Sequence, residues 1–505
     1  VVAGGRDNIV QETYSSVLGG SFNFVSANSA TIAGGRANSV TGAYGDIGGG
    51  YRNTVSGNWS SVSGGNSNMV TDTYSFVGGG QLNTVTSYGS AIGGGRWNTV
   101  SGYWATVAGG SGNSVDGAAA VVAGGRGNIA KNTYSSVLGG SFNVVSAYAA
   151  TIAGGRKNSV TGAYGDIGGG AWNTVSGNWS LVSGGSSNMV TDSYSSVGGG
   201  QLNKVTSYGS AIGGGRWNTV SGYCAIVAGG SGNSVDGAAA VVAGGLGNIA
   251  KNTYSSVLGG SFNVVSAYSA TIAGGRKNSV AAMSGGIGGG AWNTVSGPSG
   301  LVSGGSSNVV TDSYSSVGGG VGNMVTSYAS TIGGGRWNTV TNYWSTIAGG
   351  DANSVHGAAA VVGGGSANVA TSEYSSVLGG SFNVVSAYSA TIAGGRKNSV
   401  TAAYGDIGGG AWNTVSGPSG LVSGGSYNVV TESYSSVGGG TSNVVISFAS
   451  AIGGGRLNTV TRYWSTIAGG SGNSVHGAAA VVAGGRDNIV QETYSSVLGG
   501  SFNFV

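Results

Sequence analysis

The residues that could carry out chemistry are few in this chain and lie far apart along it. The two histidines, His356 and His476, are 120 residues apart, and Cys224 is the single cysteine. These residues predict neither a shared metal site nor an internal disulfide. Four carboxylates recur at the same 120-residue interval: Asp72, Asp192, Asp312 and Glu432. This spacing is too wide for an acid–base pair, so we expect no enzyme activity, no metal and no cofactor.

Glycine-rich segments raise the question of phosphate or calcium binding, but their flanking residues fit neither ligand. The pair Gly4-Gly5 recurs every 15 residues, 34 times, and is never followed by the Gly-Lys-Ser/Thr of a phosphate-binding loop. A calcium-binding β-roll needs aspartates at fixed offsets from its glycines, whereas Asp7, Asp46 and Asp116 are scattered. We therefore predict that the glycines form corners, where positive φ is required.

Two kinds of side chain recur near these predicted corners. Basic residues follow the glycine pair: Arg6, Arg36, Arg96, Arg126, Arg156, Arg216, Arg276, Lys157, Lys277 and Lys397. We interpret this stripe as favouring solubility, with an anionic polysaccharide or a neighbouring filament as alternative partners. Aromatic residues gather at the opposite corner: Tyr14, Tyr44, Trp59, Tyr74, Tyr103 and Trp104. Stacking on sugars or on an adjacent chain, and simple coverage of thin backbone, both explain this row.

Composition excludes several classes of protein. The chain of 505 residues has a net charge of +4 and 7% charged residues, which does not favour nucleic-acid binding. No apolar run is long enough for membrane insertion. The sequence begins with Val1 and shows no signal peptide, so we expect a segment of a longer, processed protein. Asn58 and Asn178 stand in Asn-Trp-Ser sequences and are candidate N-glycosylation sites.

A 15-residue repeat runs through the whole chain and determines its expected fold. Asparagine occupies every fifteenth position, 34 times without exception, beginning with Asn8, Asn23, Asn38, Asn53, Asn68 and Asn83. Two aliphatic positions per repeat form the predicted core: Val2, Val10, Val17, Val25, Ile32, Val40, Ile47 and Val55. Paired glycines at this interval are incompatible with a helix. The short alternating segments predict an all-β parallel β-solenoid of about 34 coils.

The invariant asparagine has a structural explanation in such a fold. Stacked coils place identical residues roughly 4.8 Å apart. At that distance one carboxamide can donate to the coil above and accept from the coil below, which forms a ladder. Aspartates would repel each other by roughly 3 kcal/mol per step, and no Asp stands at any of the 34 positions.

Eight coils form a longer repeat of 120 residues. The segments 2–121, 122–241, 242–361 and 362–481 resemble one another, and residues 482–505 begin a further copy. We expect residues 1–505 to form one continuous solenoid. Because each coil offers only two aliphatic side chains, the predicted core is thin, and we expect lateral association in which several chains share one core.

The pattern Ser60-x-Val62-x-Gly64, followed by Asn68-x-Val70, resembles the head repeats of trimeric autotransporter adhesins, the YadA-like β-roll. The resemblance covers the whole chain through a short motif. It implies a left-handed roll, three chains around one axis, display on a bacterial surface and adhesion to host or environmental surfaces. The chain departs from that family in its longer coil, in Val or Ile at many Ala positions, and in its regular glycine pair. We expect no stalk, neck or membrane anchor within this segment.

These features predict a self-assembling filament or adhesin rod at the cell surface or outside the cell. Its expected partners are other copies of the chain, surface glycans and host or environmental surfaces, with no nucleic acid. The alternative is an ice-binding solenoid with outward Thr-x-Thr ranks. Only three coils have both threonines: Thr84/Thr86, Thr339/Thr341 and Thr459/Thr461. Bulky or charged side chains interrupt the rank: Phe24, Met69, Lys204 and Ile249.

Overall fold

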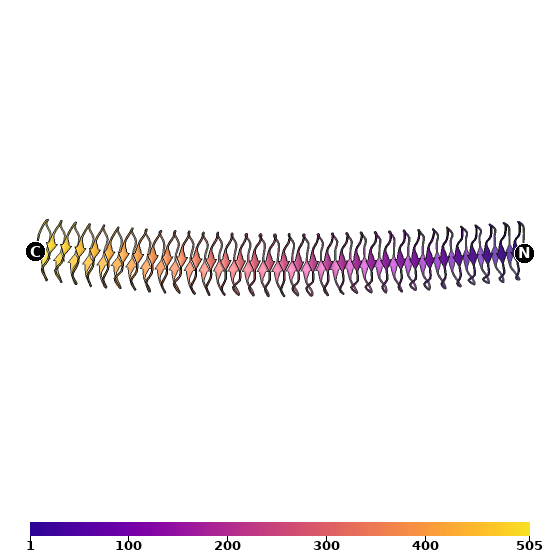
Figure 1. The fold of residues 1–505 in the computed structure, drawn as a ribbon, viewed down its shortest axis with the longest axis horizontal. Coiled ribbons are helices and arrows are strands. Elements are labelled where there is room, and N and C mark those ends of the chain that lie inside the picture. Colours follow the sequence, from indigo (N-terminus) through magenta and orange to yellow (C-terminus); the bar gives the residue numbers. More distant parts are fainter. The chain divides into compact units, whose positions relative to one another are not determined.

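The computed structural model describes residues 1–505, which divide into two units, Val1–Thr253 and Tyr254–Val505. Each unit is built entirely from two-residue strands and contains no helix, with β1 to β33 in the first and β34 to β66 in the second. Figure 1 shows the coils of each unit stacked one on the next. The predicted all-β fold is confirmed.

The strands recur at a constant interval of 15 residues. In the first unit, the odd-numbered strands run from β1 (Ile9–Val10) to β33 (Ile249–Ala250), and the even-numbered ones from β2 (Ser16–Val17) to β32 (Val241–Val242). In the second unit, the odd-numbered strands run from β35 (Val264–Val265) to β65 (Ile489–Val490), and the even-numbered ones from β34 (Ser256–Val257) to β66 (Ser496–Val497). One coil therefore contributes one strand to each of two stacks.

The coil that contains β7 (Thr54–Val55) and β8 (Ser61–Val62) illustrates the unit of structure. In both strands the first residue faces outward and the second is buried, as alternation along an extended backbone requires. Residues 56–60 connect β7 to β8, and we call residues 56–59 and their equivalents every 15 residues the aromatic corner. Residues 64–67 follow β8, and we call this position and its equivalents the glycine corner.

Neighbouring coils pair in parallel and without any shift in register. Strand β7 pairs with β9 (Met69–Val70), so that Thr54 lies beside Met69 and Val55 beside Val70. The second unit repeats this arrangement, with Thr294 beside Val309. Each coil therefore lies directly over the next within a unit, which confirms the predicted parallel β-solenoid with a 15-residue coil. A single-residue bridge at the glycine corner, such as Tyr51 to Asn66, adds a third parallel contact per coil that the sequence did not predict.

The core consists of the two aliphatic side chains per coil. Of the predicted core residues, six are inaccessible or nearly so: Val17, Val25, Ile32, Val40, Ile47 and Val55. Val2 is 48% exposed and Val10 is half-buried, because the first coil has a neighbour on one side only, so Val2 lies outside the core. These side chains are covered by their own chain. The expectation that several chains share one core is therefore wrong, and any contact between chains uses the outer surface.

Candidate functional site: two corners on a hydrogen-bonded interior

The buried asparagines fix each glycine corner to its neighbours. The Nδ2 of Asn68 donates to the carbonyl oxygens of Gly64 (2.9 Å) and, one coil further, Gly80 (3.0 Å). Its Oδ1 accepts from the backbone N–H of Asn83 at 3.0 Å. In the second unit Asn308 makes the equivalent bonds. All six asparagines named from the sequence occupy this inward-facing position. Five of them are buried, and Asn8, in the first coil, is half-buried.

This bonding differs from the amide-to-amide ladder that the sequence predicted. A direct bond joins some neighbours, such as Asn83 Nδ2 to Asn68 Oδ1 at 3.1 Å, but the recurring partners are backbone groups. The position requires two N–H donors and one acceptor in a single short planar group. A carboxylate has no donor for the two carbonyls, which excludes Asp more directly than repulsion between stacked charges does. No buried side-chain N or O atom lacks a partner.

A second ladder uses serine hydroxyls beside the aromatic corner. Ser60, 1% exposed, donates from Oγ to the carbonyl of Asp72 (2.7 Å) and accepts from the N–H of Ser75 (3.0 Å). The second unit repeats this at Ser330 and Ser345. Sequence reasoning placed Ser60 on the inner face but missed the ladder. The signal was the restriction of this position to Ser, Ala and Gly.

The geometry requires the second glycine of each pair in every coil, whereas the first glycine has a positive φ in some coils only, such as Gly49 at +156°. Gly65 has φ +94°, and a Cβ there would lie 2.1 Å from the carbonyl oxygen of Gly80. A Cβ on Gly64 would meet no atom within 4 Å. The sequence-based prediction that the glycine pair makes the corner therefore applies to Gly65 and its equivalents.

Both corners also contain left-handed residues that are not glycine. Trp59 at the aromatic corner has φ 55° and Ser67 at the glycine corner has φ 57°. In the second unit Trp344 and Lys397 adopt the same region, at 58° and 55°. This conformation costs about 1 kcal/mol for a residue with a Cβ. No pattern of residue types marks these positions in the sequence, because Ser, Trp, Lys, Ala and Tyr all occupy them.

The glycine corner combines cations with aromatic rings. Arg216 lies 3.7 Å from the ring centre of Trp217, and Lys157 lies 4.0 Å from that of Trp172. In the second unit Lys277 and Lys397 lie over Trp292 and Trp412 at 4.0 and 4.1 Å. These distances are typical of cation–π contacts. The sequence located the basic stripe but placed the aromatic residues only at the other corner.

Three ion pairs lie on the same stripe, Arg6–Asp7, Arg336–Asp351 and Arg486–Asp487, and the second of them joins adjacent coils. Arg336 and Asp351 occupy equivalent positions of adjacent coils, with Nε 2.9 Å from Oδ1. Hydrogen bonds from this guanidinium lower the pKa of Asp351, and the carboxylate raises the pKa of Arg336. Both side chains are exposed, so solvent screens the interaction and it contributes little to stability.

The aromatic corner presents rings in contact along the stack. Tyr44 and Trp59 are parallel with ring centres 3.8 Å apart, whereas Tyr388 and Tyr404 in the second unit meet edge to face at 5.7 Å. The rings stay accessible on their outer sides, and Trp104 is 63% exposed. Asn58 and Asn178 lie exposed at this corner, and their Oδ1 atoms accept hydrogen bonds from the backbone N–H groups of Ala43 and Ala163.

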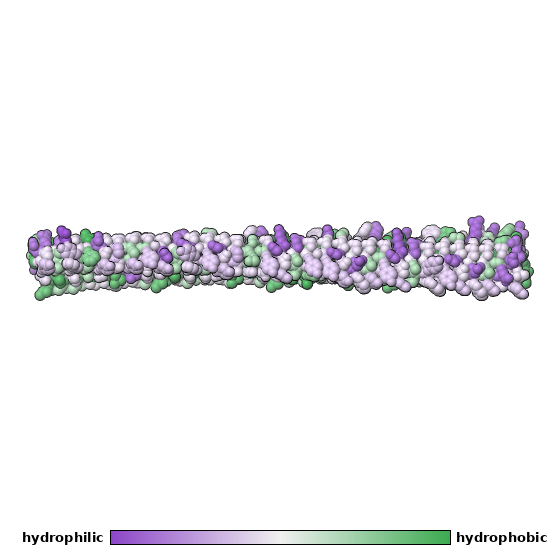
Figure 2. Space-filling model, turned by 90° about the horizontal axis from the view of Figure 1, so that it is seen from below, coloured by the Kyte–Doolittle hydropathy of each residue, from purple (hydrophilic) through white to green (hydrophobic).

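The other candidate residues lie apart from one another. His356 contacts Ser354 Oγ through Nε2 (2.7 Å) and Thr341 Oγ1 through Nδ1 (2.7 Å), at the start of the aromatic corner. A nucleophile–base pair needs a further group to orient the base and donors to stabilise an oxyanion, and Thr341 is the only group on Nδ1. Cys224 is exposed and free. The structure has no pocket and no cluster of three His, Cys, Asp or Glu residues, and Figure 2 shows a face of each unit without a hollow.

Fold and corners together define the class of the protein: a parallel β-solenoid repeat protein whose interior is a set of hydrogen-bonded ladders. No protein-family model matches the chain, and no curated protein matches its sequence. None of its structural elements is a helix that could cross a lipid bilayer. The relation to trimeric autotransporter heads rests on the repeat motif alone.

Proposed function

We propose that the chain is a structural and adhesive filament protein that acts outside the cell, without catalysis. The main support for this proposal is that outward-facing side chains at equivalent positions lie beside one another from coil to coil. In both units an outward-facing side chain at one coil has its equivalent beside it on the next, as at Thr54 and Met69 or Thr294 and Val309. A surface of this kind makes many similar weak contacts, and multivalency converts weak contacts into slow release.

The aromatic corner supplies the adhesive contacts in this proposal. Its rings are large, rigid and partly exposed, and rings of this type stack on the apolar faces of sugars or on other flat surfaces. The partners are surface glycans and host or environmental surfaces. Location at a bacterial surface, left-handed winding and a three-chain assembly, as in autotransporter heads, follow from the repeat motif and belong to the proposal.

Desorption of the full chain from glycan-coated and mineral surfaces tests adhesion. We expect slow release for the unmodified chain and release faster by on the order of tenfold after Tyr44, Trp59 and Trp104 are replaced by Ser. Replacement of three outward-facing, half-buried strand serines by Ala is the control, because it removes no ring: Ser61, Ser136 and Ser196. If the unmodified chain is retained on no surface, or the aromatic variant is released like the control, the adhesive role is wrong.

Fibre diffraction from oriented material tests the structural role. Continuous stacking predicts a layer line near roughly 4.8 Å from the coil and one near roughly 38 Å from the eight-coil repeat. Diffraction that lacks the shorter spacing would contradict a filament made of stacked coils.

A further inference from the structure

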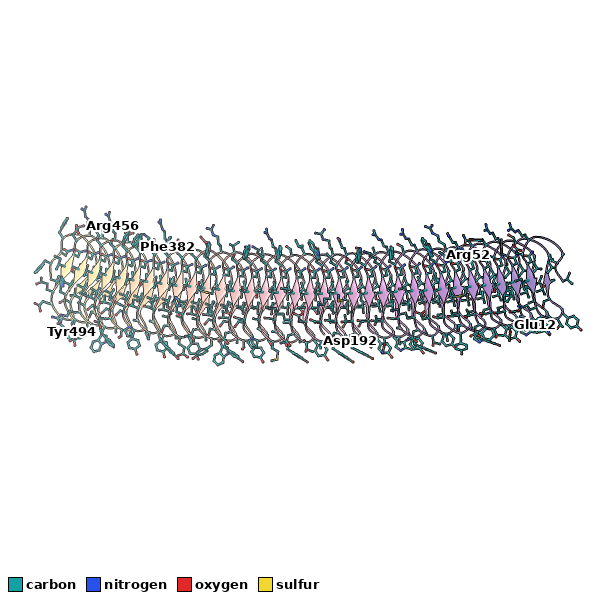
Figure 3. All side chains as sticks on the ribbon, turned by 45° about the vertical axis from the view of Figure 1, so that its right-hand side comes forward. Glu12, Arg52, Asp192, Phe382, Arg456 and Tyr494 are labelled. Atoms are coloured by element: carbon teal, nitrogen blue, oxygen red, sulfur yellow. The ribbon has the colours of Figure 1, made fainter.

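The charged side chains are sorted between the two corners. In the unit Val1–Thr253 the glycine corner carries one carboxylate, Asp7, and eight cations: Arg6, Arg36, Arg52, Arg96, Arg126, Arg156, Lys157 and Arg216. The aromatic corner of that unit carries two cations, Lys131 and Lys251, and five carboxylates: Glu12, Asp72, Asp116, Asp192 and Asp236. Figure 3 shows Arg52 on one edge of this unit and Glu12 and Asp192 on the opposite edge.

The unit Tyr254–Val505 has the same division. Its glycine corner carries two carboxylates, Asp351 and Asp487, and seven cations: Arg276, Lys277, Arg336, Arg396, Lys397, Arg456 and Arg486. Its aromatic corner carries one cation, Arg462, and four carboxylates: Asp312, Glu373, Glu432 and Glu492. Within this unit Arg456 and Tyr494 lie on opposite edges (Figure 3). A net charge of +4 for the chain therefore conceals one basic and one acidic corner.

We propose that the glycine corner of one chain docks against the aromatic corner of a second copy, with the two stacks side by side. This assembly rests on the proposed filament function and specifies its contact surface. The aromatic corner offers both carboxylates and exposed ring faces, and Arg and Lys are attracted by each. The chain already forms contacts of the second kind within its own glycine corner, where Arg216 lies over Trp217.

The spacing of the charges favours a repeating register between copies. Arg36 and Arg156 are 120 residues apart at one corner, and Asp72 and Asp192 are 120 residues apart at the other. An axial offset that brings one Arg to one Asp therefore brings the next pair together eight coils further. Surface ion pairs are individually weak, so a contact of this kind depends on their recurrence along the stack.

The proposed contact joins two different surfaces of the same chain. A contact of this type closes into a ring where the rotation between copies permits, and otherwise continues into a sheet or bundle. A three-chain ring is one such closed form. The buried core is not involved, which agrees with the full coverage of Val17 and Val55 by their own chain.

Two charge-reversal variants test this contact in the full chain. In the first, eight arginines of the glycine corner are changed to Glu: Arg36, Arg96, Arg156, Arg216, Arg276, Arg336, Arg396 and Arg456. In the second, six carboxylates of the aromatic corner are changed to Lys: Glu12, Asp72, Asp192, Asp312, Glu432 and Glu492. Light scattering and electron microscopy report lateral association, and circular dichroism with hydrogen exchange reports folding.

We expect the unmodified chain to associate at about 20 mM NaCl and to separate at about 500 mM, where charges are screened over a few ångströms. Each reversal variant alone should stay separate at low salt, because both of its corners then carry the same sign. An equimolar mixture of the two should associate again, since each variant complements the other. Circular dichroism and hydrogen exchange of each variant alone show whether it is folded.

Neutralisation provides a matched control that changes the fold less. Asp72 Oδ1 accepts from the N–H of Thr73 at 2.7 Å, and Asn132 makes the same bond to Thr133 at 2.8 Å, so Asn is compatible with that position. The test variant changes three aromatic-corner aspartates to Asn: Asp72, Asp192 and Asp312. The control changes three strand-face aspartates to Asn: Asp46, Asp166 and Asp406. We expect the concentration needed for association to rise on the order of tenfold for the first set alone.

Three results would overturn the proposal. The first is an unmodified chain that stays monomeric at low salt, and the second is a reversal variant that associates like it. The third is binding of dextran sulfate to the glycine corner without self-association, which would assign that corner to anionic polysaccharide. Release of the aromatic variant at the same rate as its control, with intact lateral association, would instead count against the adhesive function, so the two failures are distinguishable.

Discussion

Replacement of Asn68 tests whether its carboxamide holds the glycine corners together. Alanine removes the two Nδ2 bonds to Gly64 and Gly80 and leaves the N–H of Asn83 without its acceptor. Asn83 is completely buried, so water cannot replace that acceptor. An unsatisfied buried donor together with the small cavity costs about 3 kcal/mol. Aspartate keeps the acceptor but directs an oxygen without a proton at two carbonyl oxygens, and at neutral pH it costs more than alanine.

The aspartate variant has a characteristic pH dependence. Burial without a cation and close carbonyl oxygens raise the pKa of a carboxyl group at this position above its unfolded value near 4. The folded state therefore binds the proton more tightly than the unfolded chain does, and the loss of stability is largest above the raised pKa. The deficit should shrink as the pH falls through that pKa, because a protonated carboxyl group can donate to one carbonyl.

Local hydrogen exchange is the appropriate assay, since stability in a repeat protein is set by neighbouring repeats. We expect the amide of Asn83 to exchange about two orders of magnitude faster in Asn68→Ala, as 1.36 kcal/mol corresponds to a tenfold change. The equivalent coil at Asn188 is an internal reference. Asn66→Ala, at a position outside the ladder, is the matched control and should change stability by less than about 0.5 kcal/mol.

Two outcomes would refute the reasoning. Unchanged protection of Asn83 in the alanine variant would show that the carboxamide does not hold the corner. Equal protection of the alanine and aspartate variants at pH 7 and pH 4 would show that the site is open to water. In either case the invariance of this asparagine would need a different physical cause.

Further predictions concern the corners and the strand face. Gly65→Ala should destabilise its coil by about 3 kcal/mol or more, because the Cβ would lie 2.1 Å from a backbone oxygen, while Gly64→Ala should change little in the same exchange assay. Ala37→Gly should stabilise by about 0.5 kcal/mol, since Ala37 has φ 59°, whereas Ala33→Gly on a strand end should destabilise. We expect no thermal hysteresis from the purified chain, because Met69 and other bulky side chains interrupt the threonine rank. A measurable hysteresis would favour the ice-binding alternative.

Much of the fold could be predicted from the sequence because the repeat is strict. The 15-residue recurrence of Asn68, Val70 and Gly65 is sufficient to predict a parallel solenoid, since each element can be satisfied only by stacking on its equivalent. The inner direction of Asn53 and Val55 follows from alternation along a strand. The partners of the asparagine could not be predicted, because a side-chain amide bonds equally well to another amide or to a backbone carbonyl, and only the corner geometry decides between them.

The sites on the surface were harder to predict for a related reason. The stripe of basic residues is visible in the sequence because the residues recur, but the rings under its lysines are not, since Trp172 belongs to the coil after Lys157. One corner is basic and the other acidic, and this difference in charge emerges only after each charged residue has been placed at its corner of the coil. Closure of the core within one chain was missed because the small Ser60 position, which lets the two strands approach, carries no hydrophobic signal.

Within each coil, the groups that hold the fold together differ from the side chains that form the surface. The surface can therefore vary while the fold stays the same. The groups that join coils are backbone atoms, buried carboxamides and hydroxyls, and they do not depend on which side chain points outward. The position of Ser67 shows this, since Trp97, Gly112 and Lys157 occupy its equivalents with φ of 56°, 66° and 55°. A charge or a ring placed there changes the surface at about the same conformational cost. The eight-coil pattern of charges and rings, which recurs at 120-residue intervals, is therefore not needed to form the solenoid, and in our proposal it serves the contacts made at the corners.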